Sequence, residues 1–496
     1  MRRPIQIRIS MPRDGSIVGR AYLIQSIIEE ILAGRLQPRT QMPSTRMMAE
    51  HFQINRKTVV ASYEELVAQG WLESHSKRGT FVSSHLPVSV GLSPAAKSTR
   101  QPKASHTSSA LKLYGAPLMW PKQQVDGTIN FDDGVPDARL IPYGALSRAF
   151  RHSLIATTRH QLLGYGDPRG AEALRLALSE MLNTERGLAT GPDGICIARG
   201  SQMGIYLVAR VLVRQGDGVA FERLSYGPAR KAFEACGARL HHVDQDEQGL
   251  IPDSLEKLCR KHSIKAIYVT PHHQFPTTVM MPAQRRLRLL ELAEQFGFAI
   301  VEDDYDHEFH FDRQPMLPIA AFDRYHKVIY VGSLSKVLAP GLRIGYVVAS
   351  PDIINRCANE IMLLDRQGSM VTELAVAELI STGELSRLIW RAMRVYGNRR
   401  QAMADALVTQ LSEWTDFTLP VGGLAFWLRL LSPIDPDVLA SHALACGVRV
   451  LSSSQFGQGS NLSKGFRLGF GSNDEATIYK GVQRFREACT KVAKAY

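Results

Sequence analysis

One lysine in this sequence stands among residues that could adjust its chemistry. Lys336 lies in the stretch SLSKVLAPGLRIGY, residues 333–346, directly after the apolar run 328–331. A lysine that is to form a Schiff base must lose its proton, and cationic or apolar neighbours favour that loss. Ser333 and Arg343 could offer a hydroxyl and a guanidinium to a phosphate group. The stretch therefore predicts a Schiff-base lysine beside a bound phosphate, whereas a lone SxSK string would also fit a surface lysine on a turn.

A group of acidic residues follows another apolar run, in VEDDYDHEF at residues 301–309. A carboxylate such as that of Asp303, placed beside a ring nitrogen, would keep that nitrogen protonated. Clustered carboxylates at a strand end can also hold magnesium. The ligands in that case would be Glu302, Asp303, Asp304 and Asp306. No second acidic cluster supports magnesium, and the nearby HHQ string has no convincing metal-ligand spacing, so we expect no metal site.

The larger part of the chain alternates apolar, strand-like runs with amphipathic stretches. The strand-like runs are 194–198, 218–221, 266–269, 299–302 and 328–331, and helical stretches include 203–214 and 282–296. Such alternation predicts a mostly parallel α/β sheet, in which ligands bind beyond the carboxyl ends of the strands. In ARGSQMG, the backbone N–H groups of Ser201 and Gln202 would open a helix and point at an anion.

Three short helices and a hairpin are predicted for the first 84 residues. Ile24, Ile27, Ile28 and Ile31 share one face of the first helix. Ser44 is the expected N-cap of the second helix, and the third spans about 56–69. After Gly70 the order strand, basic turn, strand predicts a wing. Two helices across a tight turn, with basic residues where the second of them begins, are typical of a helix-turn-helix.

Charge supports a polyanionic partner for this segment. The whole chain of 496 residues has a formal net charge of +12, and residues 1–84 contain twelve Lys/Arg and seven Asp/Glu. Residues 85–127 lack apolar periodicity over much of their length and are rich in Ser, Pro, Ala and Lys, which predicts a flexible basic tether. We therefore divide the chain into a DNA-binding domain at 1–84, this linker, and a large domain at 128–496.

The remaining bulk properties fit a cytoplasmic protein that does not enter a membrane. The six cysteines are scattered, without the spacing of a disulfide framework or zinc site. No apolar run approaches the roughly 20 residues that span a bilayer. The N-terminal MRRPIQIRIS has charge but no apolar core of signal-peptide length.

The first segment resembles the winged helix-turn-helix of the GntR family through the strings LAGRLQPRTQMPSTRMMAEHF, INRKTVVASYEELVAQGWL and KRGTFV. The resemblance and the basic wing imply a set of DNA contacts. These are Ser44, Arg46, Arg56, Lys57, Thr58, Lys77, Arg78 and Gly79. Arg46 and Arg56 are the best candidates for base edges, and Lys57 and Lys77 for phosphate. The family usually has Pro-Gly where this chain has Pro38-Arg39.

The segment around Lys336 resembles the pyridoxal-phosphate lysine segment of fold-type-I aminotransferases. The resemblance implies that Asp303 pairs with the pyridinium nitrogen and that Tyr226 stacks on the ring. The implied phosphate ligands are Ser201, Gln202, Ser333 and Arg343. For the 3′-oxygen the candidates are Tyr305 and either His273 or Gln274, from TPHHQFPTT, where Thr278 replaces the usual glycine. Arg467, in GFRLGFG, would grip an amino-acid carboxylate, unless it is a rim arginine on a strand.

Both halves together resemble the MocR subfamily of bacterial regulators. That resemblance implies pyridoxal 5′-phosphate as cofactor, a mostly parallel large domain with a smaller C-terminal α+β subdomain, and a homodimer that binds operator DNA. An amine or amino acid at Lys336 would then alter DNA binding. Two alternatives stay open: an active aminotransferase that also binds DNA, and a sensor of pyridoxal phosphate itself.

Overall fold

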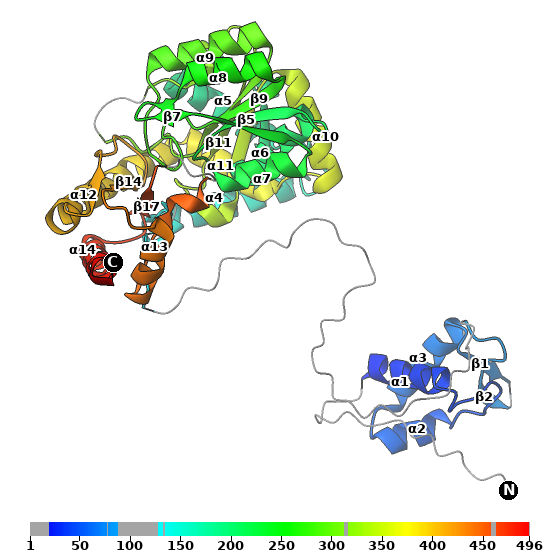
Figure 1. Ribbon diagram of the computed structural model, residues 1–496. Helices are drawn as coiled ribbons and strands as arrows, with labels where there is room; N and C mark the ends of the chain where they lie inside the picture. Colours follow the sequence, from blue (N-terminus) through cyan, green and yellow to red (C-terminus); the bar gives the residue numbers. More distant parts are fainter. Residues whose placement is uncertain are drawn as a thin grey trace. The chain divides into compact units, whose positions relative to one another are not determined.

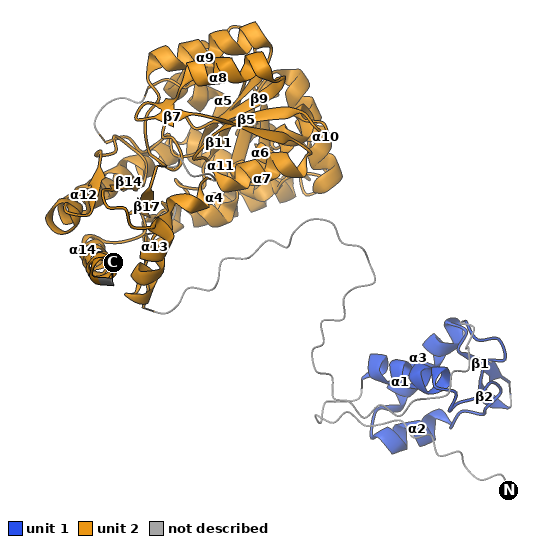
Figure 2. Ribbon diagram, viewed as in Figure 1, with its two compact units in different colours: residues 1–119 blue, residues 120–496 orange. Residues whose placement is uncertain are grey.

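The computed structural model divides the chain into two compact units, residues 1–119 and 120–496 (Figure 2). It describes residues 19–76, 78–87, 127–131, 134–311, 316–457 and 463–495. Lys77 and most of the expected tether at 85–127 lie outside the described residues. The described helices include no candidate for a membrane-spanning segment.

The smaller unit has the predicted three helices and hairpin (Figure 1). Its elements are α1 (Arg20–Leu32), α2 (Thr45–Phe52), α3 (Arg56–Ala68), β1 (Leu72–His75) and the antiparallel β2 (Gly79–Val82). The predicted N-cap Ser44 accepts a hydrogen bond from the backbone N–H of Met47, and Asn55 caps α3 by accepting from Lys57. Ile27 and Leu66 are fully buried between the helices. The capped ends and shared core hold α2 and α3 across their short turn.

The turn before α2 contains a residue in an unusual conformation. Arg39 has φ +66°, the left-handed region that glycine occupies without strain. Its backbone N–H donates to the carbonyl of Val82 at 2.9 Å, so the turn is tied to β2. The backbone therefore keeps the shape of a Pro-Gly turn although the side chain is arginine.

Arg39→Gly should raise the free energy of unfolding of the smaller unit by about 0.5–1 kcal/mol. Relief of left-handed strain, about 1–2 kcal/mol, exceeds the added freedom of the unfolded chain, about 0.4–1 kcal/mol. Hydrogen exchange of the protected backbone amides in α1 and α3 of the full-length protein would measure the change. Arg39→Ala, which keeps the strain, is the control. Unchanged or faster exchange in Arg39→Gly would contradict this account of the turn.

The central sheet of the larger unit has seven strands in the order β4-β12-β11-β10-β9-β5-β6. Their bounds are β4 (Ile195–Ala198), β5 (Gly218–Glu222), β6 (Arg239–Val243), β9 (Ile264–Val269), β10 (Ala299–Asp304), β11 (Val328–Ser333) and β12 (Gly345–Val348). The pairs among β11, β10, β9, β5 and β6 are parallel, and β12 is antiparallel to both of its neighbours. The predicted mostly parallel α/β sheet is confirmed.

Helices cover both faces of this sheet. Ile195 and Ile197 of β4 pack with one helix group, whereas Cys196 and Ala198 pack with the other, because successive side chains of a strand point to opposite faces. The first group is α4 (Tyr143–Arg159), α5 (Glu172–Arg186) and α11 (Met370–Ser381). The second is α6 (Gly200–Leu212), α7 (Gly227–Ala235) and α10 (Pro351–Leu364). A further cluster packs α8 (Pro252–Lys261) and α9 (Ala283–Phe296) beside β5, β9 and β10.

A smaller α+β subdomain completes the unit, as predicted. Its four-stranded sheet has the order β13-β14-β17-β16. The strands are β13 (Thr415–Phe417), β14 (Ala425–Leu430), β16 (Leu451–Ser452) and β17 (Gly465–Gly469), and the helices are α12 (Glu384–Leu411), α13 (Pro436–Ala445) and α14 (Glu475–Ala495). Phe426, Phe466 and Phe485 are fully buried in its core. The residues before α4 join this subdomain, because β3 (Ile129–Asn130) pairs with β15 (Val448–Arg449).

Candidate functional site

Neighbouring parallel strands bring the predicted lysine and carboxylate together. Asp303 lies near the end of β10, paired with Val331 of β11, and Lys336 follows the end of β11. The Nζ of Lys336 is 4.6 Å from the ring centroid of Tyr305, which follows β10 directly. Lys336 is half-buried. The site therefore forms at the carboxyl edge of the sheet, as expected for this class of fold.

The Asp303 carboxylate is buried and only half satisfied by the protein. Its Oδ2 accepts a 2.6 Å hydrogen bond from the hydroxyl of Tyr268 on β9, whereas its Oδ1 has no partner among the described residues. Burial raises the pKa of Asp303 to about 7, against the opposing effects of the Tyr268 hydrogen bond and the charge of Lys336. The unpaired oxygen is an acceptor ready for a donor. Tyr268 was not identified from the sequence, because this tyrosine lies inside an apolar run and resembles a core residue.

An anion cradle forms where β4 meets α6. Gly200 opens the helix with φ +76°, and a Cβ there would lie 2.8 Å from Nη2 of Arg343. That Nη2 donates to the carbonyl of Arg199 at 2.9 Å. A Cβ at Gly345 would lie 2.6 Å from the backbone nitrogen of Ser201. Both glycines thus allow the Arg343 loop to lie against the first N–H groups of α6, where Ser201 and Gln202 were predicted to receive an anion.

Two serines precede Lys336. The Oγ of the predicted Ser333 accepts a hydrogen bond from the backbone N–H of Ser335 at 3.1 Å. The Oγ of Ser335 is buried and has no partner among the described residues. Ser335, which had no assigned role, therefore offers a hydroxyl next to the lysine.

An aromatic cluster borders the site. Tyr226, the N-cap residue of α7, packs edge-on against Phe275 with ring centroids 5.2 Å apart. Phe275 also packs against Phe456, and Trp427 joins the same cluster. Tyr226 is only half-buried, so part of its ring remains exposed for stacking.

The loop after β9 carries the two candidates that the sequence left open. The side-chain amide of Gln274 donates to Glu222 and to the carbonyl of Leu224, at 3.1 and 2.8 Å. Nδ1 of His273 lies 2.7 Å from Oδ1 of Asp306. The Tyr305 hydroxyl donates to the carbonyl of His273 at 3.0 Å. Both candidates thus hold neighbouring loops together, and His273 also positions Tyr305.

The predicted Arg467 projects from β17 of the smaller subdomain. It is 1% exposed, its Nη1 donates to the carbonyl of Pro276 at 2.9 Å, and its guanidinium lies 4.4 Å from the ring centroid of Phe275. This burial argues against a rim position, and the carboxylate-binding role of Arg467 stays a prediction. Trp427 is its direct neighbour across the β14–β17 pair.

A cavity of about 730 Å³ lies beside the loop after β9. Its lining includes Arg223, Leu224, Thr278, Trp427 and Arg429. Thr278 has φ +61° and so keeps the backbone conformation of the glycine that it replaces. The position where threonine replaces the usual glycine thus faces this cavity.

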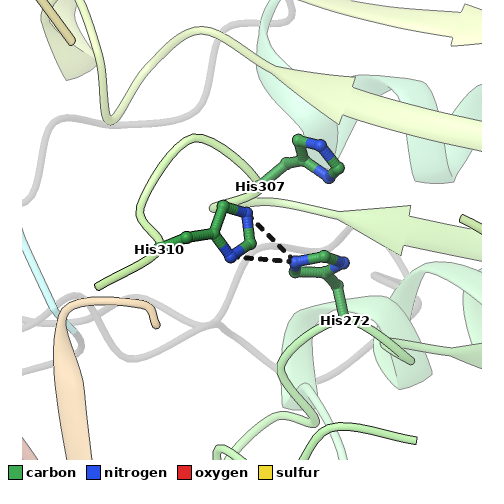
Figure 3. A group of neighbouring side chains, drawn as sticks. All are labelled: His272, His307 and His310. Atoms are coloured by element: carbon green, nitrogen blue, oxygen red, sulfur yellow. Dashed lines mark hydrogen bonds between the residues drawn. The ribbon is translucent and has the colours of Figure 1, made fainter. Parts of the chain in front are cut away.

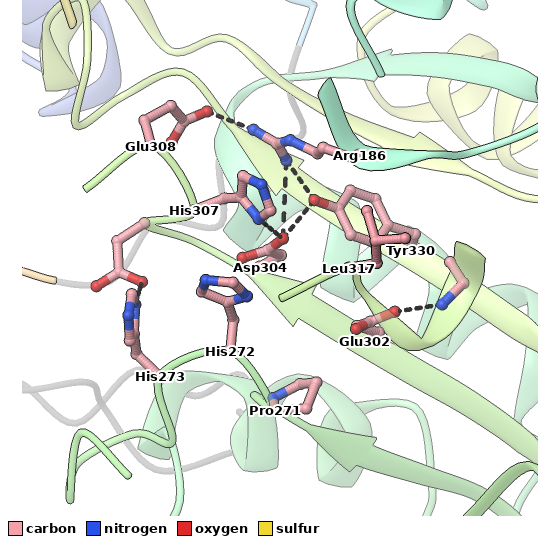
Figure 4. Close-up of polar contacts among 12 residues, drawn as sticks. Arg186, Pro271, His272, His273, Glu302, Asp304, His307, Glu308, Leu317 and Tyr330 are labelled. Atoms are coloured by element: carbon pink, nitrogen blue, oxygen red, sulfur yellow. Dashed lines mark hydrogen bonds and ion pairs between the residues drawn. The ribbon is translucent and has the colours of Figure 1, made fainter. Parts of the chain in front are cut away.

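The four carboxylates weighed as magnesium ligands have separate protein partners. Glu302 accepts from the backbone N–H groups of Ile319 and Ala320. Asp304 accepts from the Tyr330 hydroxyl at 2.6 Å, lies 2.9 Å from Nδ1 of His307, and has Arg186 at 3.8 Å (Figure 4). Asp303 and Asp306 are held by Tyr268 and His273, as described above. These contacts favour a buried polar network over a carboxylate metal site.

Three histidines lie against this network. Burial lowers the pKa of His272 well below its ordinary value, and burial, with the neighbouring histidines, lowers the pKa of His310 to about 3. Their rings pack with that of His307 at centroid distances of 4.6–5.4 Å. Their neighbourhood could not be read from the sequence, because His272 follows β9 whereas the other two follow β10.

The predicted DNA-contacting residues of the smaller unit gather around the starts of α2 and α3 and at the wing. Arg46, Arg56 and Lys57 are exposed. The Nε of Arg46 lies 3.1 Å from Glu50, and that of Arg56 lies 3.4 Å from the Thr45 hydroxyl. The other described members are Ser44, Thr58, Arg78 and Gly79, of which Thr58 alone is half-buried.

Family models match both units. The model described as "Aminotransferase class I and II" matches residues 128–485, and the model described as "Bacterial regulatory proteins, gntR family" matches residues 21–82. The α-aminoadipate aminotransferase LysN of Thermus thermophilus, solved with N-(5′-phosphopyridoxyl)-L-leucine, has 29% sequence identity and a TM-score of 0.70. The similarity covers 75% of this chain and 94% of LysN.

Two curated relatives share both units. The "Probable rhizopine catabolism regulatory protein MocR" of Rhizobium meliloti is 30% identical over 96% of this chain and 95% of its own length. The HTH-type transcriptional regulator TauR of Rhodobacter capsulatus is 31% identical over 96% of this chain and 97% of its own. The chain therefore belongs to the aminotransferase class I and II family and is a MocR-type transcriptional regulator with a GntR DNA-binding domain and a pyridoxal-phosphate-dependent domain.

Proposed function

We propose that this regulator holds pyridoxal phosphate on Lys336 and changes its affinity for operator DNA when an amino compound reaches that site. The observation that supports this proposal most directly is the buried Asp303 carboxylate, whose Oδ1 lacks a partner among the described residues. A protonated ring nitrogen is the kind of donor that such an oxygen needs. The residues around Lys336 thus fit the cofactor.

The other end of the cofactor also has suitable ligands. The backbone N–H groups of Ser201 and Gln202, at the start of α6, would receive the phosphate together with Arg343. Ser333 was predicted to add a hydroxyl, and the unpartnered Oγ of Ser335 makes it a second donor. The partial positive charge at the N-terminus of α6, a guanidinium and two hydroxyl donors together suit the binding of a phosphate dianion.

The remaining residues would orient the ring and hold protons. When bound, the cofactor supplies an aldehyde that reacts with amines and a ring that withdraws electrons. Tyr226 would stack on that ring. The Tyr305 hydroxyl would donate to its 3′-oxygen in place of the hydrogen bond that it makes to the carbonyl of His273. His273 and Gln274 would act there by holding the loop after β9 in place. Asp303 would keep the ring nitrogen protonated.

We propose an amino acid or related amine as the effector. The buried guanidinium of Arg467 could bind a carboxylate with two parallel hydrogen bonds. The cavity lined by Arg223, Thr278 and Trp427 would receive the rest of the molecule, since Trp427 is the strand neighbour of Arg467. The effector would thereby contact both the large and the small subdomain.

Regulation would follow from movement of these subdomains within a cytoplasmic homodimer. An effector that binds one subdomain arrangement more tightly shifts the population toward it, and a coupled change in the two DNA-binding heads alters operator affinity. We retain the division into a DNA-binding domain at 1–84, a tether at 85–127 and a large domain at 128–496. The competing functions are an enzyme that completes transamination and a sensor of cofactor loading alone.

Lys336→Ala should abolish the visible absorption band of the protein reconstituted with pyridoxal phosphate, because no other amine would hold the cofactor covalently. Lys327→Ala, which removes a lysine just before β11, is the matched control and should keep the band. Absorption spectra before and after an amine panel then separate the three functions. A stable shift supports an effector sensor, continuous conversion to pyridoxamine phosphate supports an enzyme, and indifference to amines supports a cofactor sensor. A wild type that takes up no cofactor contradicts the proposal.

Arg467→Lys should weaken the binding of an amino-acid effector by about 10–100-fold, because lysine cannot replace a bidentate guanidinium–carboxylate contact. Titration of the spectral shift gives the dissociation constant. The effector's decarboxylated amine is the matched ligand control, and its affinity should change little between wild type and variant. Arg449→Lys, in the same subdomain, controls for the substitution itself. Equal losses for both ligands would show that Arg467 does not bind the carboxylate.

Arg56→Ala and Lys57→Ala should weaken DNA binding in different ways. Arg56→Ala removes a base contact, which costs about 1–3 kcal/mol of binding free energy and relaxes sequence specificity. Lys57→Ala removes a phosphate contact, which weakens binding to all DNA sequences alike and reduces the slope of log K against log salt concentration by about 1. Fluorescence anisotropy on a duplex selected by the wild type from a random pool would measure both across a salt series. Arg20→Ala is the control, since Arg20 pairs with Glu65 in the C-terminal half of α3. Variants with unchanged affinity would refute this DNA-binding face.

A further inference from the structure

Three histidines from two loops converge in the larger unit (Figure 3). His272 belongs to the loop after β9, and His307 and His310 belong to the loop after β10. One ring nitrogen of each lies within 4.8 Å of one ring nitrogen of each of the others. Nε2 of His272 is 3.2 Å from Nε2 and 3.4 Å from Nδ1 of His310. The imidazoles therefore meet through their polar edges, which is not how apolar packing arranges aromatic rings.

Ring nitrogens in this cluster lack protein partners. His272 is 2% exposed and His307 is 4% exposed. Nδ1 of His272 and Nε2 of His307 have no hydrogen-bond partner among the described residues. An unsatisfied nitrogen in the interior costs free energy, so Nε2 of His307 points to a missing ligand, whereas the nitrogen of His272 that faces His310 is its Nε2.

The carboxylate of Asp304 prepares one of these histidines to bind a cation. Its Oδ2 is 2.9 Å from Nδ1 of His307 (Figure 4). A carboxylate at Nδ1 keeps the proton there, which leaves the lone pair on Nε2. This is the outer-shell arrangement that orients metal-binding histidines and increases their basicity.

We propose that His272, His307 and His310 form a binding site for a divalent transition-metal ion, with Zn²⁺ as the best fit. Three neutral imidazoles suit zinc, copper or nickel, and not magnesium or calcium, which prefer oxygen ligands. Zinc–nitrogen distances of about 2.0–2.1 Å place tetrahedral ligand nitrogens about 3.4 Å apart. The contact between His272 and His310 already has this spacing. Water would occupy the fourth position.

The remaining adjustment is small, and solvent can reach the site. Since all three nitrogens lie within 4.8 Å of one another, the third must move by about 1.6 Å at most to reach tetrahedral spacing. His310 is half-buried, which gives the ion a route of entry. The backbone of His310 also pairs with that of Gly422 in the smaller subdomain. The ion would therefore fasten the β9 and β10 loops to each other at the junction of the subdomains.

This site is independent of the effector. Its ligands are not the residues proposed to touch the cofactor, although His273 and Tyr305 are carried by the same two loops. Metal binding should therefore persist in Lys336→Ala. Loss of metal in the histidine variants with the visible band retained would separate the two sites.

The test is zinc stoichiometry in the reduced, full-length protein after removal of metals by a chelator and dialysis against Zn²⁺. Mass spectrometry should find one Zn²⁺ per chain in the wild type and less than one fifth of that in His310→Ala. His262→Ala is the matched control, because His262 packs against His241 at 4.6 Å in a histidine pair outside the cluster. It should keep the metal. Circular dichroism should be unchanged in both variants, and His310→Gln replaces His310→Ala if the latter does not fold.

Two further measurements decide whether the ion sits in this cluster. Asp304→Asn should lower Zn²⁺ affinity about 10–100-fold in competition with a chromophoric chelator, because it removes the partner that orients His307. Co²⁺ should give tetrahedral d–d bands without thiolate charge transfer, since the proposed ligands are nitrogens. Wild type without stoichiometric zinc, or equal binding by wild type and His310→Ala, would overturn the proposal. Thiolate bands would do the same by assigning the metal to the cysteines.

Discussion

The Asp303 carboxylate is buried where three adjacent parallel strands end, and this placement constrains everything around it. Burial of an ionised oxygen is costly unless donors surround it. One donor, the Tyr268 hydroxyl, comes from β9, and Lys336 approaches from the end of β11. The strand order β11-β10-β9 brings these groups together despite their separation in sequence. The sheet therefore holds one buried carboxylate whose second oxygen has no partner among the described residues, and in the proposed function that oxygen would face the cofactor ring.

Helices pack against both faces of the sheet that carries this edge, whereas Arg467 belongs to the smaller subdomain. The lysine, the carboxylate and the anion cradle all lie at the carboxyl ends of strands of the central sheet, whose two faces are covered by helices. Arg467 comes instead from the four-stranded sheet, and it reaches across to Pro276 and Phe275. In the proposed function, reaction chemistry and ligand recognition would thus belong to different subdomains, which is the arrangement that a domain-closing sensor requires.

The sequence was most informative where function occupies consecutive residues. Ser44 at a helix start, Lys336 in its string and Asp303 at a strand end could each be predicted from local pattern. Tyr268 could not, because a buried tyrosine inside an apolar run looks like core until its partner on the next strand is known. The antiparallel direction of β12 was also inaccessible, since its apolar residues read like those of a parallel strand.

Residue type was misleading at two turns. Arg39 and Thr278 stand where glycine would be expected, yet both adopt positive φ and preserve the turn. The surrounding backbone hydrogen bonds, such as that from Arg39 to Val82, outweigh the local preference. The histidine cluster was hidden for a different reason, because its members become neighbours only when β9 and β10 pair.

The direction of β12 has a mechanical consequence. Because β12 returns beside β11, with Ser333 opposite Gly345, the intervening segment is a loop closed by paired strands and not a crossover through a helix. Lys336 and Arg343 both belong to this closed loop. The short chain between them, whose ends are held by paired strands, limits how far apart the two residues can move. Under the proposed regulation, subdomain movement would change what lies above the loop without separating Lys336 from Arg343. A ligand bound to both residues would therefore keep its position relative to the central sheet during such a movement.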